Sequence, residues 1–96
     1  MKPFEILPVA RDEWRQAAQF YLDHSPRAQE RFEAELDETL SWIQRSPRTW
    51  PLISPSVRRC FVRHFPYSVL FQIHPDRITI ISVMHQKRRP DSWRKR

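Results

Sequence analysis

Glycine is absent from this chain of 96 residues. Phosphate-binding loops of the dinucleotide-binding and Walker types need backbone without a Cβ atom beside the phosphate. The sequence therefore excludes both loops, and with them the ordinary nucleotide-dependent enzymes. Nine prolines are present instead, so the tight turns are expected to use proline, Asn/Asp and serine.

Cysteine and long apolar runs are also scarce. Cys60 is the only cysteine, which rules out an internal disulfide and favours a reducing compartment. No apolar run approaches the roughly 18 residues of a membrane span, and Glu5 interrupts the N-terminal segment that would form a signal core. The histidines lack the spacing of metal ligands. We expect a cytoplasmic protein without membrane contact, metal or cofactor.

Positive charge is concentrated in the second half of the chain. Residues 57–96 hold ten Lys/Arg and two Asp, a net charge of +8, whereas residues 1–56 have a net charge of −2. A surface built only for solubility would mix the two signs. The partner is therefore expected to be a polyanion or an acidic protein segment. The length predicts one domain over 1–96, with a basic C-terminal tail over 86–96.

The first half is predicted to form a strand and a helical hairpin. A short apolar alternation predicts an edge strand before Pro8. Apolar residues recur every three or four positions across 9–24 and 26–45, which is typical of two amphipathic helices. Ser25 is a natural N-cap between them, and Pro26 fits the first helical position. So short a connection makes the two helices antiparallel.

Alternating apolar residues in the second half predict three strands, at 57–64, 67–73 and 78–84. The first places Cys60 on the helix-facing side and Arg59 and Arg63 on the other. The last is apolar on both faces, which predicts that a partner segment covers its second face as a helix or an added strand. The fold class is α+β, with an N-terminal strand and a helix hairpin packed on one face of a small, mainly antiparallel sheet.

This order of elements resembles a known family. A helical hairpin followed by RR-x-F-V-x-x-FPYSVLF and ITIISVMH-x-KRRP-x-x-W-x-x-R is similar to the RelE/ParE superfamily of type II toxin–antitoxin modules, and most similar to the ParE branch. The resemblance implies a small bacterial toxin held inactive in a hetero-oligomer with an acidic antitoxin, ParD-like or of another family. ParE-type toxins act on DNA gyrase, whereas RelE-type toxins cut messenger RNA on the ribosome. One fold hosts both activities, so membership alone does not choose between them.

The residues themselves disfavour RNA cleavage. Metal-free cleavage needs a base, an acid and a cation around one phosphate. RelE-like nucleases commonly open the second predicted strand with an arginine, where this chain has Ser68, and the tail lacks a terminal tyrosine or histidine. His85 keeps the alternative open as acid or base, with Arg63 or Arg88 as the cation. If His85 has no catalytic role, it is a polar residue at the end of a strand that forms a local hydrogen bond.

The prediction is therefore a toxin that binds DNA gyrase, or a gyrase–DNA complex, without catalysis. The alternatives are a ribosome-dependent mRNA endonuclease and a degenerate toxin that retains only antitoxin binding. Target or partner contacts are assigned to basic and aromatic side chains of the second half, namely Arg59, Arg63, His85, Arg88, Arg89, Trp93, Arg94 and Arg96. Cys60 is expected to be a small buried hydrophobe and not a nucleophile.

Overall fold

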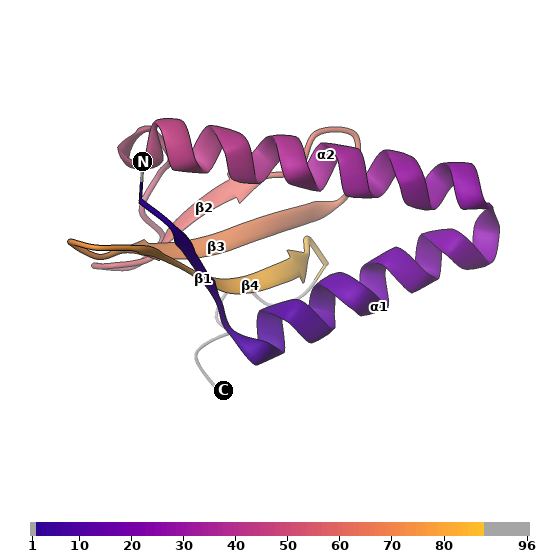
Figure 1. Ribbon diagram of the computed structural model, residues 1–96, viewed down its shortest axis with the longest axis horizontal. Helices are drawn as coiled ribbons and strands as arrows, with labels where there is room; N and C mark the ends of the chain where they lie inside the picture. The colour runs from indigo at the N-terminus through magenta and orange to yellow at the C-terminus, as the bar shows by residue number, and fades with distance from the viewer. Residues whose placement is uncertain (1, 88–96) are drawn as a thin grey trace.

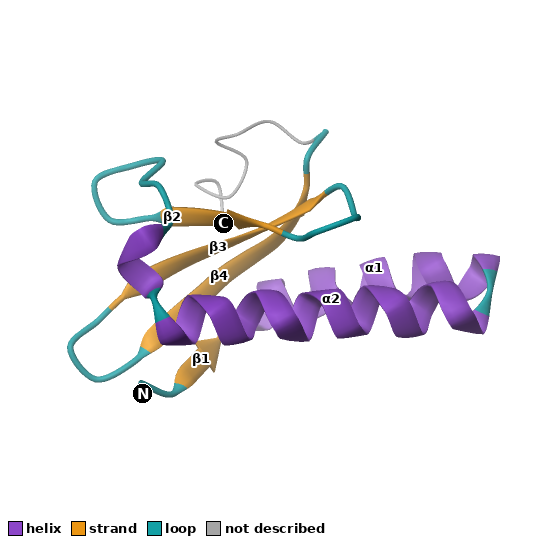
Figure 2. Cartoon of the chain, turned by 90° about the horizontal axis from the view of Figure 1, so that it is seen from above, coloured by secondary structure: helices purple, strands orange, loops and turns teal. Residues whose placement is uncertain are grey.

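The computed structural model describes residues 2–87 of the chain. Its elements are β1 (Phe4–Ile6), α1 (Pro8–His24), α2 (Pro26–Arg45), the 3₁₀ turn η1 (Pro47–Thr49), β2 (Arg58–Phe61), β3 (Tyr67–Ile73) and β4 (Ile78–His85). The helix hairpin lies on one face of the four-stranded sheet and extends beyond it (Figures 1 and 2). The predicted α+β class and order of elements are confirmed. Neither helix in this described part is long and apolar enough to cross a membrane.

A single residue joins the two helices. The Ser25 Oγ accepts a hydrogen bond from the Ala28 amide at 3.0 Å, and Pro26 occupies the first turn of α2. The Ser25 amide in turn donates to the Tyr21 carbonyl at 3.0 Å and so closes α1. One serine therefore ends the first helix and caps the second, as the sequence predicts.

The sheet has the strand order β1-β4-β3-β2. β2, β3 and β4 form an antiparallel meander, while β1 runs parallel to β4 at the edge of the sheet. β1 pairs with β4 only as far as Ile80, where the Leu7 amide donates to the Ile80 carbonyl at 3.1 Å. The β3–β4 register shifts at Leu70/Phe71, so the pairing on either side of this irregularity differs by one residue.

The main core lies between the helices and the sheet. Phe32 is fully buried there and stacks on Tyr21 at a ring distance of 5.1 Å. The buried members of this core are Ala10, Ala17, Phe32, Leu36, Leu40, Ile43, Cys60, Val62, Val69, Phe71, Ile78, Ile80 and Val83. The apolar stripes predicted for both helices therefore face the sheet, and Cys60 faces the helices as predicted.

The opposite face of the sheet carries a second, smaller apolar cluster. Its buried members are Val57, Leu70, Ile81 and Met84, with Leu7 and Ile53 packed against them. The Ile53 amide donates to the Val57 carbonyl at 2.8 Å, so the proline-rich segment before β2 is held over this face. The prediction that a partner must bury the second face of residues 78–84 is therefore wrong. The chain buries that face with its own side chains.

A buried carboxylate supports β4 where β1 has ended. Glu13 on α1 is 9% exposed, and its Oε1 accepts from the Val83 amide at 3.1 Å and from the Ser82 hydroxyl at 2.9 Å. A backbone N–H at a buried strand edge needs such a partner, because leaving it unpaired is costly. Glu13 thus continues the pairing of β4 with a side chain in place of a strand.

Replacing Glu13 should accordingly destabilise the fold. Glu13→Ala leaves the Val83 amide and the Ser82 hydroxyl without this acceptor, and we expect it to lower the free energy of unfolding by about 2 kcal/mol. Glu13→Gln retains one acceptor oxygen and should cost less. Urea unfolding followed by circular dichroism measures both, with exposed Glu30→Ala on α2 as the control. Equal stabilities for Glu13→Ala and Glu30→Ala would contradict this role.

Candidate partner-binding surfaces

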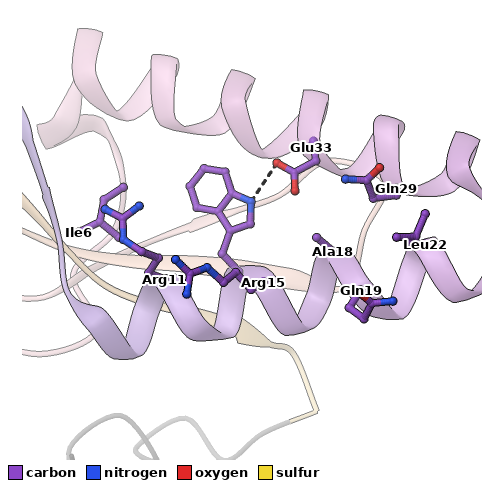
Figure 3. A pocket seen from close by; sticks show the side chains of 9 residues that line it. Ile6, Arg11, Arg15, Ala18, Gln19, Leu22, Gln29 and Glu33 are labelled. Atoms are coloured by element: carbon purple, nitrogen blue, oxygen red, sulfur yellow. Dashed lines mark hydrogen bonds between the residues drawn. The ribbon is translucent and has the colours of Figure 1, made fainter.

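A groove with a volume of about 540 Å³ runs along the helix hairpin. It runs from β1 between α1 and α2 (Figure 3). Its lining residues are Ile6, Arg11, Trp14, Arg15, Ala18, Gln19, Leu22, Gln29 and Glu33. We call this surface the hairpin groove.

One hydrogen bond crosses the hairpin groove. The Trp14 Nε1–H of α1 donates to Glu33 Oε2 of α2 at 3.0 Å, which fixes the indole between the helices (Figure 3). Ala18 leaves room beside the ring, and Leu22 is 41% exposed near the far end. The groove therefore presents apolar surface to solvent, which is typical of a site that receives another chain.

The α1 side of the hairpin groove carries positive charge. Arg11 and Arg15 are both exposed there. Arg15 lies 3.7 Å from Asp12, but both side chains are largely solvated, so this pair contributes little. The guanidinium groups remain available to an acidic partner above the apolar floor.

A second cavity, about 140 Å³, opens on the sheet face away from the helices. β2 and β3 pair Arg59 with Leu70 and Phe61 with Ser68, and β3 and β4 pair Ser68 with Met84. Paired residues point to the same side of a sheet, so these five side chains share one face. Ile53, His85 and Gln86 complete the lining. We call this cavity the sheet pocket.

His85 borders the sheet pocket, but its ring packs elsewhere. The ring contacts Tyr67 edge to face at 5.1 Å, and Tyr67 packs against the main core on the helix side. The His85 Nδ1 accepts from the Lys87 amide at 3.0 Å, so in the neutral ring the proton resides on Nε2. This bond favours His85 as a hydrogen-bond donor at Nε2 and disfavours it as a base there.

The other predicted site residues lie apart from His85. Arg63 is exposed, with its Cζ 5.7 Å from the ring centroid of Trp42 on α2, and it lines neither of the two cavities that His85 borders. Arg59 alone shares the sheet pocket with His85. The remaining predicted contacts, Arg88, Arg89, Trp93, Arg94 and Arg96, lie outside the described residues.

Cleavage chemistry needs its acid, base and cation around one phosphate. Within residues 2–87, Arg63 is not brought to His85, and the buried Ser68 supplies no charge at the start of β3. What the described surface offers is an apolar groove with a basic side and a small pocket with one guanidinium. The groove and the pocket are both suited to binding a partner.

Comparison with known proteins identifies the family of the chain. The family model "ParE toxin of type II toxin-antitoxin system, parDE" matches residues 4–90. The chain belongs to the ParE toxin family. The resemblance seen in the sequence is confirmed, and such a toxin has an antitoxin as its partner. Among solved structures the chain is similar to "Chromosomal ParDE TA system from P. aeruginosa", with a TM-score of 0.76 at 17% identity, covering 88% of this chain and 96% of that one. That likeness shows the fold. No curated protein matches.

Sequence reasoning missed two roles in this ParE toxin. The sequence alone assigns neither role: Trp14 bridges the two helices across the hairpin groove, and Glu13 accepts hydrogen bonds from β4. Both depend on contacts between different elements, since Trp14 bonds to Glu33 on the next helix and Glu13 bonds to β4. No spacing rule within one helix would have found them.

Cys60 offers a chemical test of the fold. It is 1% exposed, and burial raises the pKa of its thiol to about 11, against roughly 8.5 for a free cysteine. Only the thiolate reacts with alkylating agents, so at pH 8 we expect modification about 100-fold slower than in denaturant. Mass spectrometry after timed exposure to iodoacetamide measures both rates. Equal rates would place Cys60 at the surface.

Proposed function

We propose that this ParE-family toxin is neutralised by an acidic antitoxin and inhibits DNA gyrase by binding, without cleaving RNA. The observation that carries the choice against cleavage is the engagement of His85 with Tyr67 and with the Lys87 amide, away from Arg63. Because residues 2–87 do not bring an acid, a base and a cation together, the toxin is proposed to act by occupying its target. The predicted tail residues Arg88, Arg89, Trp93, Arg94 and Arg96 belong to this proposal as target contacts, together with Arg63.

Two assays run in parallel distinguish the candidate functions. The purified chain should inhibit gyrase supercoiling and leave ribosomal translation of a reporter mRNA intact. His85→Gln should change supercoiling inhibition by less than about 3-fold, because no proton transfer is required. If the chain cuts mRNA on ribosomes and His85→Gln lowers that rate by about 100-fold, the endonuclease alternative is correct. Failure in both assays, with antitoxin binding intact, identifies a degenerate toxin.

We further propose that the hairpin groove receives the antitoxin. An amphipathic helix buries its apolar side in such a groove through residues spaced three and four apart. Exposed Leu22 and the ring of Trp14 provide the apolar contacts, and Arg11 and Arg15 face the acidic flank. A disordered acidic segment that folds on this surface would match both features.

A charge placed in the hairpin groove should weaken that complex. Leu22→Asp sets a carboxylate in the apolar contact, and we expect antitoxin affinity to fall by about 10-fold or more. Leu52→Asp is the matched control, since Leu52 is 52% exposed and lies outside the hairpin groove. Isothermal titration calorimetry measures affinity, and circular dichroism checks folding. Equal losses in the two variants would place the antitoxin elsewhere.

A further inference from the structure

The sheet pocket contains a cationic donor that the protein leaves unused. Arg59 is half-buried, and its Nε is fully buried without a hydrogen-bond partner. Among the described residues only the Trp50 Nε1 shares that state. A buried N–H that bonds to neither protein nor water carries a desolvation cost, and such a group calls for an explanation.

The Arg59 guanidinium is held in a defined position. Its Cζ lies 4.8 Å from the ring centroid of Phe61, so the planar group rests on an aromatic face. Within the described part of the chain, no residue lining the sheet pocket carries a carboxylate. The walls include Ile53, Leu70 and Met84, and apolar walls strengthen any hydrogen bond formed inside.

The neighbouring arginines are engaged elsewhere. The Arg58 Nη1 donates to the Trp50 carbonyl at 2.7 Å and to the Arg48 carbonyl at 3.2 Å. Arg63 lies over Trp42. Among residues 2–87, the sheet pocket therefore offers one guanidinium fork, which matches one carboxylate. A nucleic-acid backbone, with its row of phosphates, would call for a row of cations.

We propose that the sheet pocket is a carboxylate site and that an Asp or Glu side chain of the antitoxin occupies it. The carboxylate accepts from the Arg59 fork while its methylene groups contact the exposed ring of Phe61. The identity of this occupant rests on the proposed antitoxin, whose acidic character complements the +8 charge of residues 57–96. The chemistry of the pocket is independent of any gyrase activity.

The first experiment tests the pocket on the full-length chain alone. The Arg59 Nε–H resonance is followed by NMR while N-acetyl-glutamate amide is added, with N-acetyl-glutamine amide as the neutral counterpart. We expect a saturable shift with the glutamate analogue and no comparable shift with the glutamine analogue. Equal responses, or no saturable shift with glutamate, would overturn the proposal. A stronger shift with inorganic phosphate at equal ionic strength would overturn the carboxylate assignment in favour of a phosphate ligand.

The second experiment tests the occupant. Arg59→Gln and Arg31→Gln each remove one positive charge, but Arg31 is exposed on α2 and lines neither the sheet pocket nor the hairpin groove. We expect antitoxin affinity to fall by about 10-fold or more in Arg59→Gln and by less than about 2-fold in Arg31→Gln. Equal losses of affinity in the two variants would show that only the net charge matters, and would refute an antitoxin carboxylate in the sheet pocket. Unchanged antitoxin affinity with lost gyrase inhibition in Arg59→Gln would assign the carboxylate to the target instead.

Discussion

The short parallel pairing of β1 with β4 joins the helix layer to the sheet. Only three residue pairs form it, and side chains reinforce it: Glu5 Oε1 accepts from Thr79 at 2.8 Å and from Arg77 at 3.1 Å. We call these two hydrogen bonds the Glu5 clamp. The bond from Thr79, followed by the bond from Arg77, lowers the pKa of Glu5. The clamp therefore stabilises the fold fully above the ordinary pKa of a glutamate, and this stabilisation is lost as the pH falls through the lowered pKa. β1 leads directly into α1, so this clamp also positions Glu13 and the floor of the hairpin groove.

The two proposed binding surfaces lie on opposite sides of the molecule. The hairpin groove lies between the helices, and the sheet pocket opens on the face that the helices do not cover (Figure 2). A folded globular partner could reach only one of them at a time, whereas an extended acidic chain could follow the surface from one to the other.

The sequence predicts most of the fold because its signals are local. Ser25 and Pro26 mark the hairpin, and the apolar periods select the buried faces of both helices. Placement of the site residues depends on information that no local pattern carries. The register shift at Leu70/Phe71 decides that His85 pairs with Tyr67, and so places its ring on the helix side.

Local sequence patterns also fail to predict how the second face of the sheet is buried. The sequence of residues 78–84 predicts a partner because apolar residues on both faces of a strand show how much surface must be buried, and not what buries it. Here Ile53 and Val57 cover that face from the segment before β2. The segment before β2 has several prolines and no periodic pattern of apolar residues, so its sequence does not predict this packing.

Both edges of the sheet, formed by the short strands β1 and β2, are blocked against further pairing. The Arg59 amide of β2 donates to the Pro51 carbonyl at 3.0 Å, and Leu52 bridges Arg58, so the preceding segment occupies that margin. On the other side β1 is three residues long, and beyond it the Glu13 carboxylate accepts from the Val83 amide of β4. Such margins give another copy no template for growing a continuous ribbon of strands. The free toxin is thereby protected from polymerising into fibres through the edges of its sheet.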